Sequence, residues 1–156
     1  KGNRYPLFQL KDGGKFISTI CYDDFKIEFV RKYLNNVKEH PNFIINITND
    51  SFMGNTIFSY QHLNYARWNA VLFGLPLIRA TNTGYSAVIY PNGEIVQMTN
   101  LLKEEFLDFD FPVVDSEPTL YQKFGFVPFL VFWCLLLLTI FIFDHFYKLG
   151  TIRESK

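Results

Sequence analysis

Residues 15–47 read KFISTICYDDFKIEFVRKYLNNVKEHPNFIINI, and the order of the patterns in this stretch decides the fold class. Residues 15–22 are a strand-like run. Residues 25–37 repeat apolar side chains with the helical period, and Asp24 stands where a helix N-cap is expected. Residues 43–47 are a short continuous apolar run, which is typical of a strand covered on both faces. The stretch therefore predicts a strand, a helix and a second strand.

The sequence on either side extends this pattern. Residues 7–10 and 15–22 flank the turn cluster Lys-Asp-Gly-Gly, which predicts a hairpin. Residues 59–74 predict a second helix, which Gly74 and Pro76 end. Further strands are expected at 77–80, 85–90, 94–99 and 106–111. Alternating strands and helices followed by a run of strands predict a layered α/β domain.

Composition excludes several classes of protein. The chain has 156 residues, 15 basic and 15 acidic side chains, and 49% hydrophobic residues. Zero net charge argues against a nucleic-acid binder, which would show a basic excess. Two Cys are too few for a disulfide scaffold, and the three scattered His lack metal-ligand spacing. We therefore expect no nucleic acid, no metal and no cofactor.

Much of the apolar excess is one segment near the end of the chain. No charged residue lies between Lys123 and Asp144, and residues 126–143 read FVPFLVFWCLLLLTIFIF. A helix of about 20 residues spans ~30 Å, the thickness of a bilayer's hydrocarbon core. A buried core helix is the alternative, but such helices are usually shorter and keep a polar stripe. The sequence predicts a transmembrane helix over residues 124–145.

The charges that flank this helix predict its orientation. Residues 101–123 carry six acidic and two basic side chains, whereas Lys148, Arg153 and Lys156 follow the helix. By the positive-inside rule the tail, residues 146–156, is expected in the cytoplasm. Residues 1–111 then form a domain outside the membrane, and residues 112–123 a linker.

Cys21 is a candidate nucleophile because it lies at the junction of a strand and a helix. A thiol at such an elbow can be exposed, and the start of a helix favours its thiolate. The alternative is that Cys21 is a small buried hydrophobe, as lone cysteines in apolar strands commonly are. Cys134 falls in the predicted membrane helix and is interpreted as a packing residue.

Other polar residues have structural explanations that compete with catalytic ones. His62 could serve Cys21 as a base, but a surface or helix-capping role is favoured. The Asn49-Asp50 pair closes a strand and is typical of a turn. Arg67 and Arg79 stand in apolar surroundings, so each is expected to pair with a carboxylate or a carbonyl.

Several segments resemble one family in a single order. Residues 20–23, ICYD, resemble the ICYE segment of the apolipoprotein N-acyltransferases, a membrane branch of the nitrilase superfamily. Residues 46–54, NITNDSFMG, look like that family's NITNDAWFG stretch. The similarity continues at Gln61-His62, Ala66-Arg67, Ala70, residues 79–89, residues 91–94 and Tyr121. The similarity spans essentially residues 1–147 without large gaps.

The resemblance implies a fold and an activity. The family carries a nitrilase-like αββα sandwich on the periplasmic side of the bacterial inner membrane, followed by a final membrane helix. Residues 1–111 would be the C-terminal portion of that carbon–nitrogen hydrolase domain in a longer protein. The implied reaction transfers an acyl chain from a phospholipid, through a cysteine thioester, to the N-terminal diacylglyceryl-cysteine of an apolipoprotein.

The resemblance also implies roles for individual residues. Cys21 matches the nucleophile, and Tyr22 and Asp23 match positions that support the site and its oxyanion. The residues expected to shape the site are Asn49, Asp50, Arg79 and Asn82. The family's catalytic Glu and Lys lie upstream of the cysteine strand and match nothing in this chain, so we expect these residues alone to be inactive.

Five positions depart from the family pattern, and one of them is Phe52, which replaces a Trp. Asp23 stands where the family usually has Glu, and Asn69, Leu72 and Leu75 stand where it has Arg, Glu and Arg. These changes leave open a second hypothesis, a membrane-tethered nitrilase-like pseudoenzyme that binds lipid or lipoprotein without turnover. A third, a soluble-type amidase, is disfavoured by the predicted membrane helix.

Overall fold

The computed structural model describes residues 4–111, 113 and 115–154, with side chains as far as residue 145. It divides into two units, residues 1–123 and 124–156. The first is built on one sheet of six strands in sequential order. The strands are β1 (Phe8–Gln9), β2 (Lys15–Ile20), β3 (Phe43–Thr48), β4 (Leu77–Thr81), β5 (Ala87–Ile89) and β6 (Ile95–Met98). Because β2, β3 and β4 are parallel and helices connect them, the predicted α/β class is confirmed.

A tight turn joins β1 to β2, as the predicted hairpin requires. The Leu10 backbone N–H donates to the Gly14 carbonyl at 2.7 Å, and that of Gly13 donates to the Leu10 carbonyl at 3.1 Å. Gly13 has φ +97°, a left-handed conformation that favours glycine. The turn residues therefore fix where the chain reverses.

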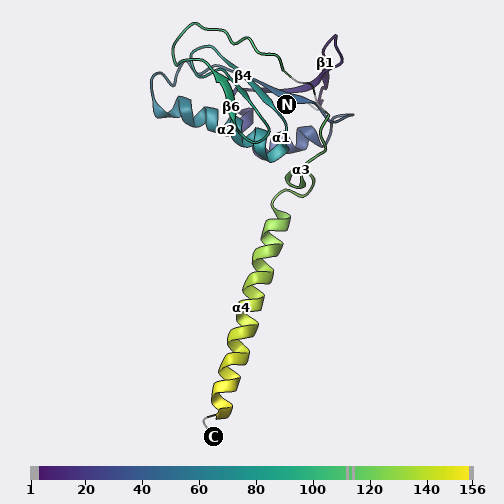
Figure 1. Cartoon of the computed structure of the whole chain (residues 1–156), viewed down its shortest axis with the longest axis vertical. Helices are drawn as coiled ribbons and strands as arrows, with labels where there is room; N and C mark the ends of the chain where they lie inside the picture. The colour runs from purple at the N-terminus through teal and green to yellow at the C-terminus, as the bar shows by residue number, and fades with distance from the viewer. Residues whose placement is uncertain (1–3, 112, 114, 155–156) are drawn as a thin grey trace. The chain divides into compact units, whose positions relative to one another are not determined.

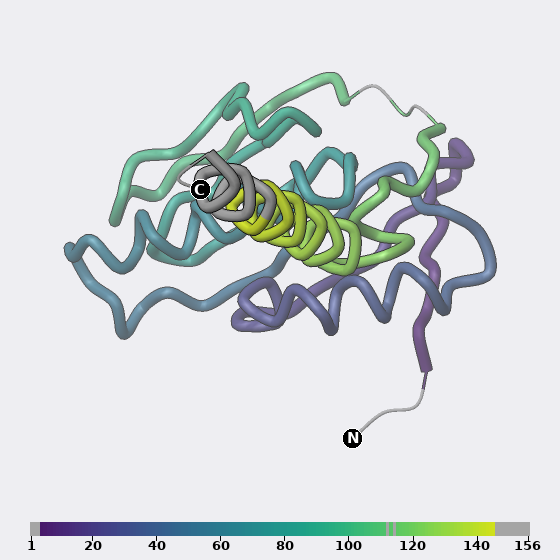
Figure 2. The backbone as a smooth tube through the Cα atoms, turned by 90° about the horizontal axis from the view of Figure 1, so that it is seen from below, coloured from purple at the N-terminus to yellow at the C-terminus, as the bar shows by residue number. Residues whose placement is uncertain are grey.

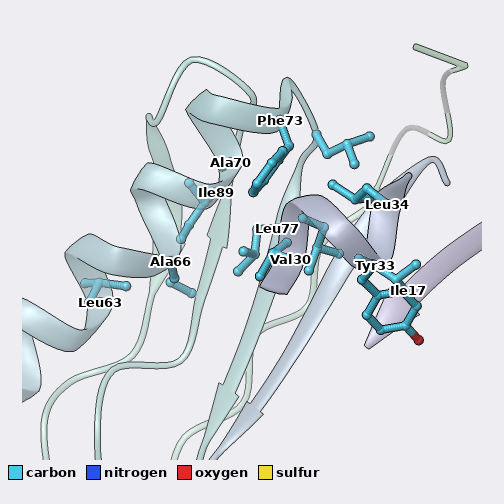
Figure 3. Close-up of a cluster of buried hydrophobic side chains, with 13 residues drawn as sticks. Ile17, Val30, Tyr33, Leu34, Leu63, Ala66, Ala70, Phe73, Leu77 and Ile89 are labelled. Carbon is cyan, nitrogen blue, oxygen red and sulfur yellow. The ribbon is translucent and has the colours of Figure 1, made fainter. Parts of the chain in front are cut away.

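Helices α1 (Ile27–Leu34) and α2 (Ile57–Phe73) lie on the same face of the sheet (Figures 1 and 2). Aliphatic and aromatic side chains from both helices meet those of the strands in one buried cluster (Figure 3). Its labelled members are Ile17, Val30, Tyr33, Leu34, Leu63, Ala66, Ala70, Phe73, Leu77 and Ile89. The helix α2 ends at Gly74, which has φ +63°. Burial of this apolar face is what holds the helices on the sheet.

The register of the parallel strands places two different rows of side chains under the helices. Ile17 pairs with Ile44 and Ile44 with Leu77, which gives a buried aliphatic row. Two residues further along, Thr19, Asn46 and Arg79 make a second row that is equally buried but polar. The carboxyl ends of the three strands therefore carry the polar side chains into the interior.

The opposite face of the sheet is only partly covered. Near the carboxyl ends of the strands, Ile20 is 67% and Ile47 is 55% exposed. The segment after β6 arches over this side of the sheet (Figure 1), and Phe111 packs edge-to-face on Phe43 at 5.1 Å. An apolar strip thus remains open to solvent in this part of the chain.

The predicted strand at residues 106–111 is wrong, since that segment has no strand pairing. Its alternation of Phe with Asp has another cause. Phe109 and Phe111 pack against Tyr90 and Phe43, whereas Asp108 and Asp110 face solvent. The alternation therefore reflects a segment that lies across the sheet face. Its Phe109 and Phe111 side chains pack against the domain, and its Asp side chains are exposed to solvent.

The first helix begins later and ends earlier than the periodicity predicts. Residues Cys21–Phe25 form a short 3₁₀ helix, η1, and α1 starts only at Ile27. The N-cap of α1 is Lys26, so the prediction that Asp24 caps this helix is wrong. Asp24 is 1% exposed because its carboxylate is used inside the domain.

The end of the predicted linker is a docked helix, α3 (Leu120–Phe124). Gln122 is 2% exposed, its carbonyl accepts from Asn35 Nδ2 at 3.0 Å, and its Oε1 lies 3.0 Å from His40 Nε2. Thr119 Oγ1 donates to the Leu72 carbonyl at 2.6 Å. Residues 119–123 are therefore part of the folded unit, while residues 112 and 114 of the predicted linker lie outside the described residues.

The second unit is the helix α4 (Val127–Glu154). Its stretch Val127–His145 is long and apolar enough to cross a membrane, and none of it is buried within the structure. The apolar helix predicted at 124–145 is thus present, with a start three residues later. Of the predicted tail, residues 146–154 continue this helix, and residues 155–156 lie outside the described residues. The direction in which the helix crosses a membrane stays a prediction.

Candidate functional site

Cys21 follows the last residue of β2 and begins η1, so it occupies the sharp elbow predicted for it. Its φ is +49°, a left-handed backbone conformation that residues other than glycine rarely adopt. The side chain is half-buried, and the thiol is free. Strained residues of this kind persist only where the surroundings hold them, and they cluster at functional sites. The geometry favours a presented thiol over a buried hydrophobe.

Three side chains hold the backbone of this elbow. Asp23 Oδ2 accepts from the Ile20 N–H at 3.2 Å, which ties the end of β2 to η1. Asn46 Nδ2 lies 3.5 Å from the Cys21 carbonyl, and Asn69 Nδ2 donates to the Asp24 carbonyl at 2.7 Å. At the position where the resembled family has Glu, the shorter Asp23 side chain thus accepts a hydrogen bond from the backbone of the elbow itself.

Beneath the elbow lie four charged side chains, Asp24, Asp50, His62 and Arg79, which we call the buried quartet. None is more than 1% exposed. His62 Nδ1 lies 2.8 Å from Asp50 Oδ1 and its Nε2 lies 3.2 Å from Asp24 Oδ1. Arg79 donates to Asp24 Oδ2 at 3.1 Å and to Asp50 Oδ2 at 3.0 Å. Each carboxylate therefore contacts both cations.

The quartet is electrically balanced. Burial lowers the pKa of His62, but hydrogen bonds to Asp24 and Asp50 outweigh it and raise that pKa to about 9. Burial likewise raises the pKa of Asp50, while the His62 hydrogen bond and the Arg79 charge bring it below its usual value. At neutral pH, two carboxylates therefore face an imidazolium and a guanidinium. Both ring N–H groups of the imidazolium, that of His62, donate to these carboxylates.

The residues predicted to shape the site do lie together. Asn82 Nδ2 donates to Asn49 Oδ1 at 2.8 Å, and the Asp50 backbone N–H donates to Asn82 Oδ1 at 3.1 Å. Arg79 also donates to Asn46 Oδ1 at 2.7 Å. One continuous network of hydrogen bonds therefore joins the loops that follow β3 and β4 to the cysteine elbow.

One of the competing structural explanations is wrong, and another is correct but incomplete: Asn49 and Asp50 do form the predicted turn, in which Ser51 N–H donates to Asn49 Oδ1 at 3.0 Å and Met53 N–H to the Asp50 carbonyl at 2.9 Å. His62 is neither a surface residue nor a helix cap, since it is fully buried between two carboxylates. Asp50 does more than close a turn, because its carboxylate binds Arg79. The signal for His62 was available: it lies four residues before Ala66 and one before Leu63, and so shares the apolar face of α2.

The two arginines behave differently. The predicted ion pairing of Arg79 is confirmed by its contacts with both carboxylates. Arg67 instead finds a carbonyl, since its Nε donates to Gly93 O at 2.9 Å, and it also donates to Asn64 Oδ1 at 3.0 Å. Only Arg79 therefore belongs to the site.

The positions that depart from the family pattern are accommodated without buried unpaired charge. Leu75 is fully buried, and Leu72 packs against the core. Asn69 bridges Asp24 O and Tyr65 O, although its Oδ1 has no hydrogen-bond partner among the described residues. The structure thus replaces charged side chains by apolar packing at this end of α2.

An apolar pocket of about 500 Å³ opens next to the elbow. Tyr22, the residue after Cys21, lies in its wall, with its ring 4.8 Å from that of Phe25 and 5.4 Å from that of His62. The lining residues are Tyr22, Phe25, Phe52, Met53, Thr56, Phe58 and Gln61. In the part of the chain that the structure describes, no three His, Cys, Asp or Glu side chains are arranged to hold a metal ion. Two residues of η1, Tyr22 and Phe25, therefore wall an apolar cavity next to the turn that Cys21 begins.

A strained cysteine at the carboxyl end of a parallel strand, above a buried charged cluster, is the kind of site that nucleophilic acyl chemistry uses. The family described as carbon-nitrogen hydrolase matches residues 1–119. The chain therefore belongs to the carbon–nitrogen hydrolase family.

Curated relatives narrow the comparison. The chain is 36% identical over 133 residues to apolipoprotein N-acyltransferase 2 of Leptospira interrogans, a match that covers 84% of this chain and 22% of the relative. It is 35% identical over 143 residues to the apolipoprotein N-acyltransferase of Rickettsia bellii, which covers 92% and 27% respectively. The chain thus spans about a quarter of the length of these relatives.

A solved structure shares the fold. Nit3 of Saccharomyces cerevisiae, a member of branch 10 of the nitrilase superfamily, superposes with a TM-score of 0.53 at 23% identity. The match covers 66% of this chain and 39% of Nit3. At this identity the likeness shows a nitrilase-like fold, which is the architecture expected from the sequence.

Proposed function

We propose that this chain is the C-terminal part of an apolipoprotein N-acyltransferase that uses Cys21 as its nucleophile. The observation that carries the proposal is the left-handed Cys21 elbow beside an apolar pocket of about 500 Å³. The names of the curated relatives and the apolar helix α4 support the same activity at a membrane.

The first half-reaction acylates the cysteine. The Cys21 thiolate attacks the carbonyl carbon of a phospholipid ester, so that the C–S bond forms and the ester C–O bond breaks. The lysophospholipid leaves with a proton from a general acid. We assign the Tyr22 backbone N–H as the donor to the developing oxyanion, a contact that stabilises acyl-transfer intermediates. The pocket walled by Tyr22 and Phe25 suits the apolar acyl chain.

The second half-reaction regenerates the thiolate. The free α-amino group of a diacylglyceryl-cysteine attacks the thioester, the C–N bond forms and the C–S bond breaks. A base takes the proton of the amine. A thioester suits both halves because it is reactive toward amines yet forms from an ester through a thiolate. We assign the acid, the base and the catalytic Lys to residues outside this chain, as the family resemblance implies.

The orientation follows from the flanking charges. We place residues 1–123 on the periplasmic side of the bacterial inner membrane and residues 146–156 in the cytoplasm. This assignment is tested with a reporter that is active only in the cytoplasm and is fused after Lys156. We expect that reporter to be active. Activity of a periplasm-specific reporter at the same position would reverse it.

The chain offers a matched pair of cysteines for the decisive experiment. The complete protein that carries these residues is compared as wild type, Cys21→Ser and Cys134→Ser, with a radiolabelled phospholipid as donor. We expect a hydroxylamine-sensitive acyl-thioester in the wild type and in Cys134→Ser, and none in Cys21→Ser. Cys134 lies in α4 and serves as the control for loss of a thiol. Full transferase activity in Cys21→Ser would refute the proposal.

The second candidate is a membrane-tethered pseudoenzyme that binds lipid or lipoprotein without turnover. It is favoured by Asp23, whose carboxylate is tied to the Ile20 N–H, and by the apolar residues Leu72 and Leu75. Complementation of a bacterium that lacks its N-acyltransferase separates the two. Growth with triacylated lipoproteins supports the enzyme, whereas lipid binding without rescue supports the pseudoenzyme.

We also propose that residues 1–123 are inactive by themselves. Ile20 and Ile47 leave an apolar strip of the sheet exposed, which a further layer of the domain would cover. A monomeric and active preparation of these residues would contradict this view.

A further inference from the structure

We propose that the buried quartet positions Cys21. In this proposal His62 and Arg79 bind the turn that carries Cys21 and hold its backbone in the left-handed conformation that presents the thiol. This inference rests on the proposed function for the meaning of the thiol, but its geometry stands independently. His62 and Arg79 are positioning residues, since neither is placed to touch a substrate.

The first path from the quartet to the thiol runs through Asp24. This residue belongs to η1, three positions after Cys21, and its two carboxylate oxygens are held by different partners. His62 binds Oδ1 at 3.2 Å and Arg79 binds Oδ2 at 3.1 Å. A carboxylate held at both oxygens cannot rotate freely, so the turn that carries Cys21 is fixed from below.

A second path runs through the strand next to the elbow. Arg79 donates to Asn46 Oδ1 at 2.7 Å, which orients the amide of Asn46. The Nδ2 of that amide is directed at Thr19 Oγ1, at 3.1 Å, and at the Cys21 carbonyl, at 3.5 Å. Arg79 therefore acts on the backbone of Cys21 itself as well as on Asp24.

A third contact joins the quartet to the residue after the nucleophile. The rings of Tyr22 and His62 stack with centroids 5.4 Å apart and an interplanar angle of 20°. Phe25 covers the same imidazole at 4.8 Å. The position of the imidazole thus sets the position of the Tyr22 ring, and with it the backbone N–H proposed to face the oxyanion.

The charge on His62 is essential to this arrangement. The groups that face it are Asp24 from η1, Asp50 from the loop after β3, Arg79 from β4, and the rings of Tyr22 and Phe25. Two buried carboxylates opposite a single guanidinium would leave one negative charge uncompensated. A neutral imidazole could also donate to only one of them. The protonated ring supplies both missing features.

The test compares His62→Gln with the double variant Asp50→Asn/His62→Gln in the complete protein, with His40→Gln as the matched control. The single variant leaves one uncompensated negative charge, whereas the double variant restores a balanced Asp24–Arg79 pair. His40 also contacts a buried partner, Gln122, but lies outside the quartet. For each protein, the melting temperature, the kcat and KM of acyl transfer, and the alkylation rate of Cys21 relative to Cys134 are measured well below melting.

We expect His62→Gln to lower kcat at least a hundredfold with KM changed less than threefold, and to change the relative alkylation of Cys21 by tenfold or more. The double variant should recover at least tenfold in both, and His40→Gln should match the wild type. A His62→Gln protein that is less stable but keeps its kcat and its Cys21 alkylation rate would overturn the proposal. If the wild type transfers no acyl chain, the proposed function fails, and alkylation alone still decides whether the quartet positions Cys21.

Discussion

Two rows of side chains, contributed by the same three parallel strands, differ in what they do for the protein. Ile17, Ile44 and Leu77 lie side by side beneath the helices, and none is more than 1% exposed. Two residues further along each strand, Thr19, Asn46 and Arg79 are buried to the same degree. The first row needs no hydrogen-bond partners, whereas the polar atoms of the second do. Among the described residues all of them find one except Arg79 Nε.

The difference shows that burial alone does not identify the core. The aliphatic row gains stability from apolar packing, which is non-directional and tolerates small displacements. The polar row is directional, because each distance and angle depends on the next group in the network. A fold can therefore place a rigid site at one end of a sheet and an ordinary core at the other.

The comparison is most severely tested at Arg79. Arg79→Met leaves Asp24 and Asp50 buried with only His62 as a cation, and removing one partner of a buried ion pair costs about 3–5 kcal/mol. We expect the largest loss of unfolding free energy and no measurable acyl transfer. Thermal unfolding of the detergent-solubilised complete protein, with a transfer assay, checks this. Near-wild-type activity in Arg79→Met would show that the polar row does not order the site.

Leu77→Ala tests the aliphatic row. Leu77 is fully buried, and truncation of such a side chain costs ~2–5 kcal/mol through lost packing and a residual cavity. We expect a lower melting temperature but an unchanged transfer rate per folded molecule. A loss of rate at temperatures where the variant remains folded would remove the distinction between the two rows.

Gly84→Ala disturbs the polar row sterically and without a change of charge. A Cβ at position 84 would lie 2.2 Å from Asp50 Oδ2, so Asp50 must move away from Arg79. Overpacking of this kind costs roughly 1–3 kcal/mol. We expect reduced stability and slower acyl transfer, measured beside Gly14→Ala. In that control the new Cβ meets nothing closer than the Val113 side chain at 3.3 Å. Equal behaviour of the two variants would argue against a tight Asp50 site.

A change of pH, rather than a substitution, tests the charge on His62. Its pKa is raised from 6.5 to about 9 in the folded protein. The stability that this provides is complete below pH 6.5 and is lost as the pH rises through about 9, because the unfolded chain has already released the proton. Melting temperatures recorded from pH 6 to 10 should therefore fall at the alkaline end. In Asp50→Asn/His62→Gln this alkaline fall should be reduced, and its persistence there would assign it to other groups.

The sequence predicts the aliphatic row far better than the polar one. Periodicity and turn residues give the hairpin, both helices and the strands β2 to β6, because apolar patterning determines these elements locally. The position of Asp24 illustrates the limit. Next to a helical pattern it looks like an N-cap, and only contacts with His62 and Arg79, 38 and 55 residues away along the chain, reveal its use.

The same limit applies to the segment after β6. The alternation of Phe and Asp at residues 106–111 fits a strand equally well as a chain that lies across a sheet. The choice depends on whether a strand edge or a sheet face is available, which is a property of the assembled fold. For Cys21, local pattern leaves the role undecided, and the role of nucleophile that the family resemblance implies stays a prediction.

The left-handed conformation of Cys21 lowers the stability of the folded protein at the position of the proposed nucleophile. A side chain at φ +49° costs roughly 1–2 kcal/mol relative to the relaxed backbone, a penalty that glycine does not incur. Cys21→Gly should therefore melt at a higher temperature than Cys21→Ala, although both lack the thiol. If so, glycine is the more stable residue at position 21, and the proposed role of the thiol would account for the cysteine there.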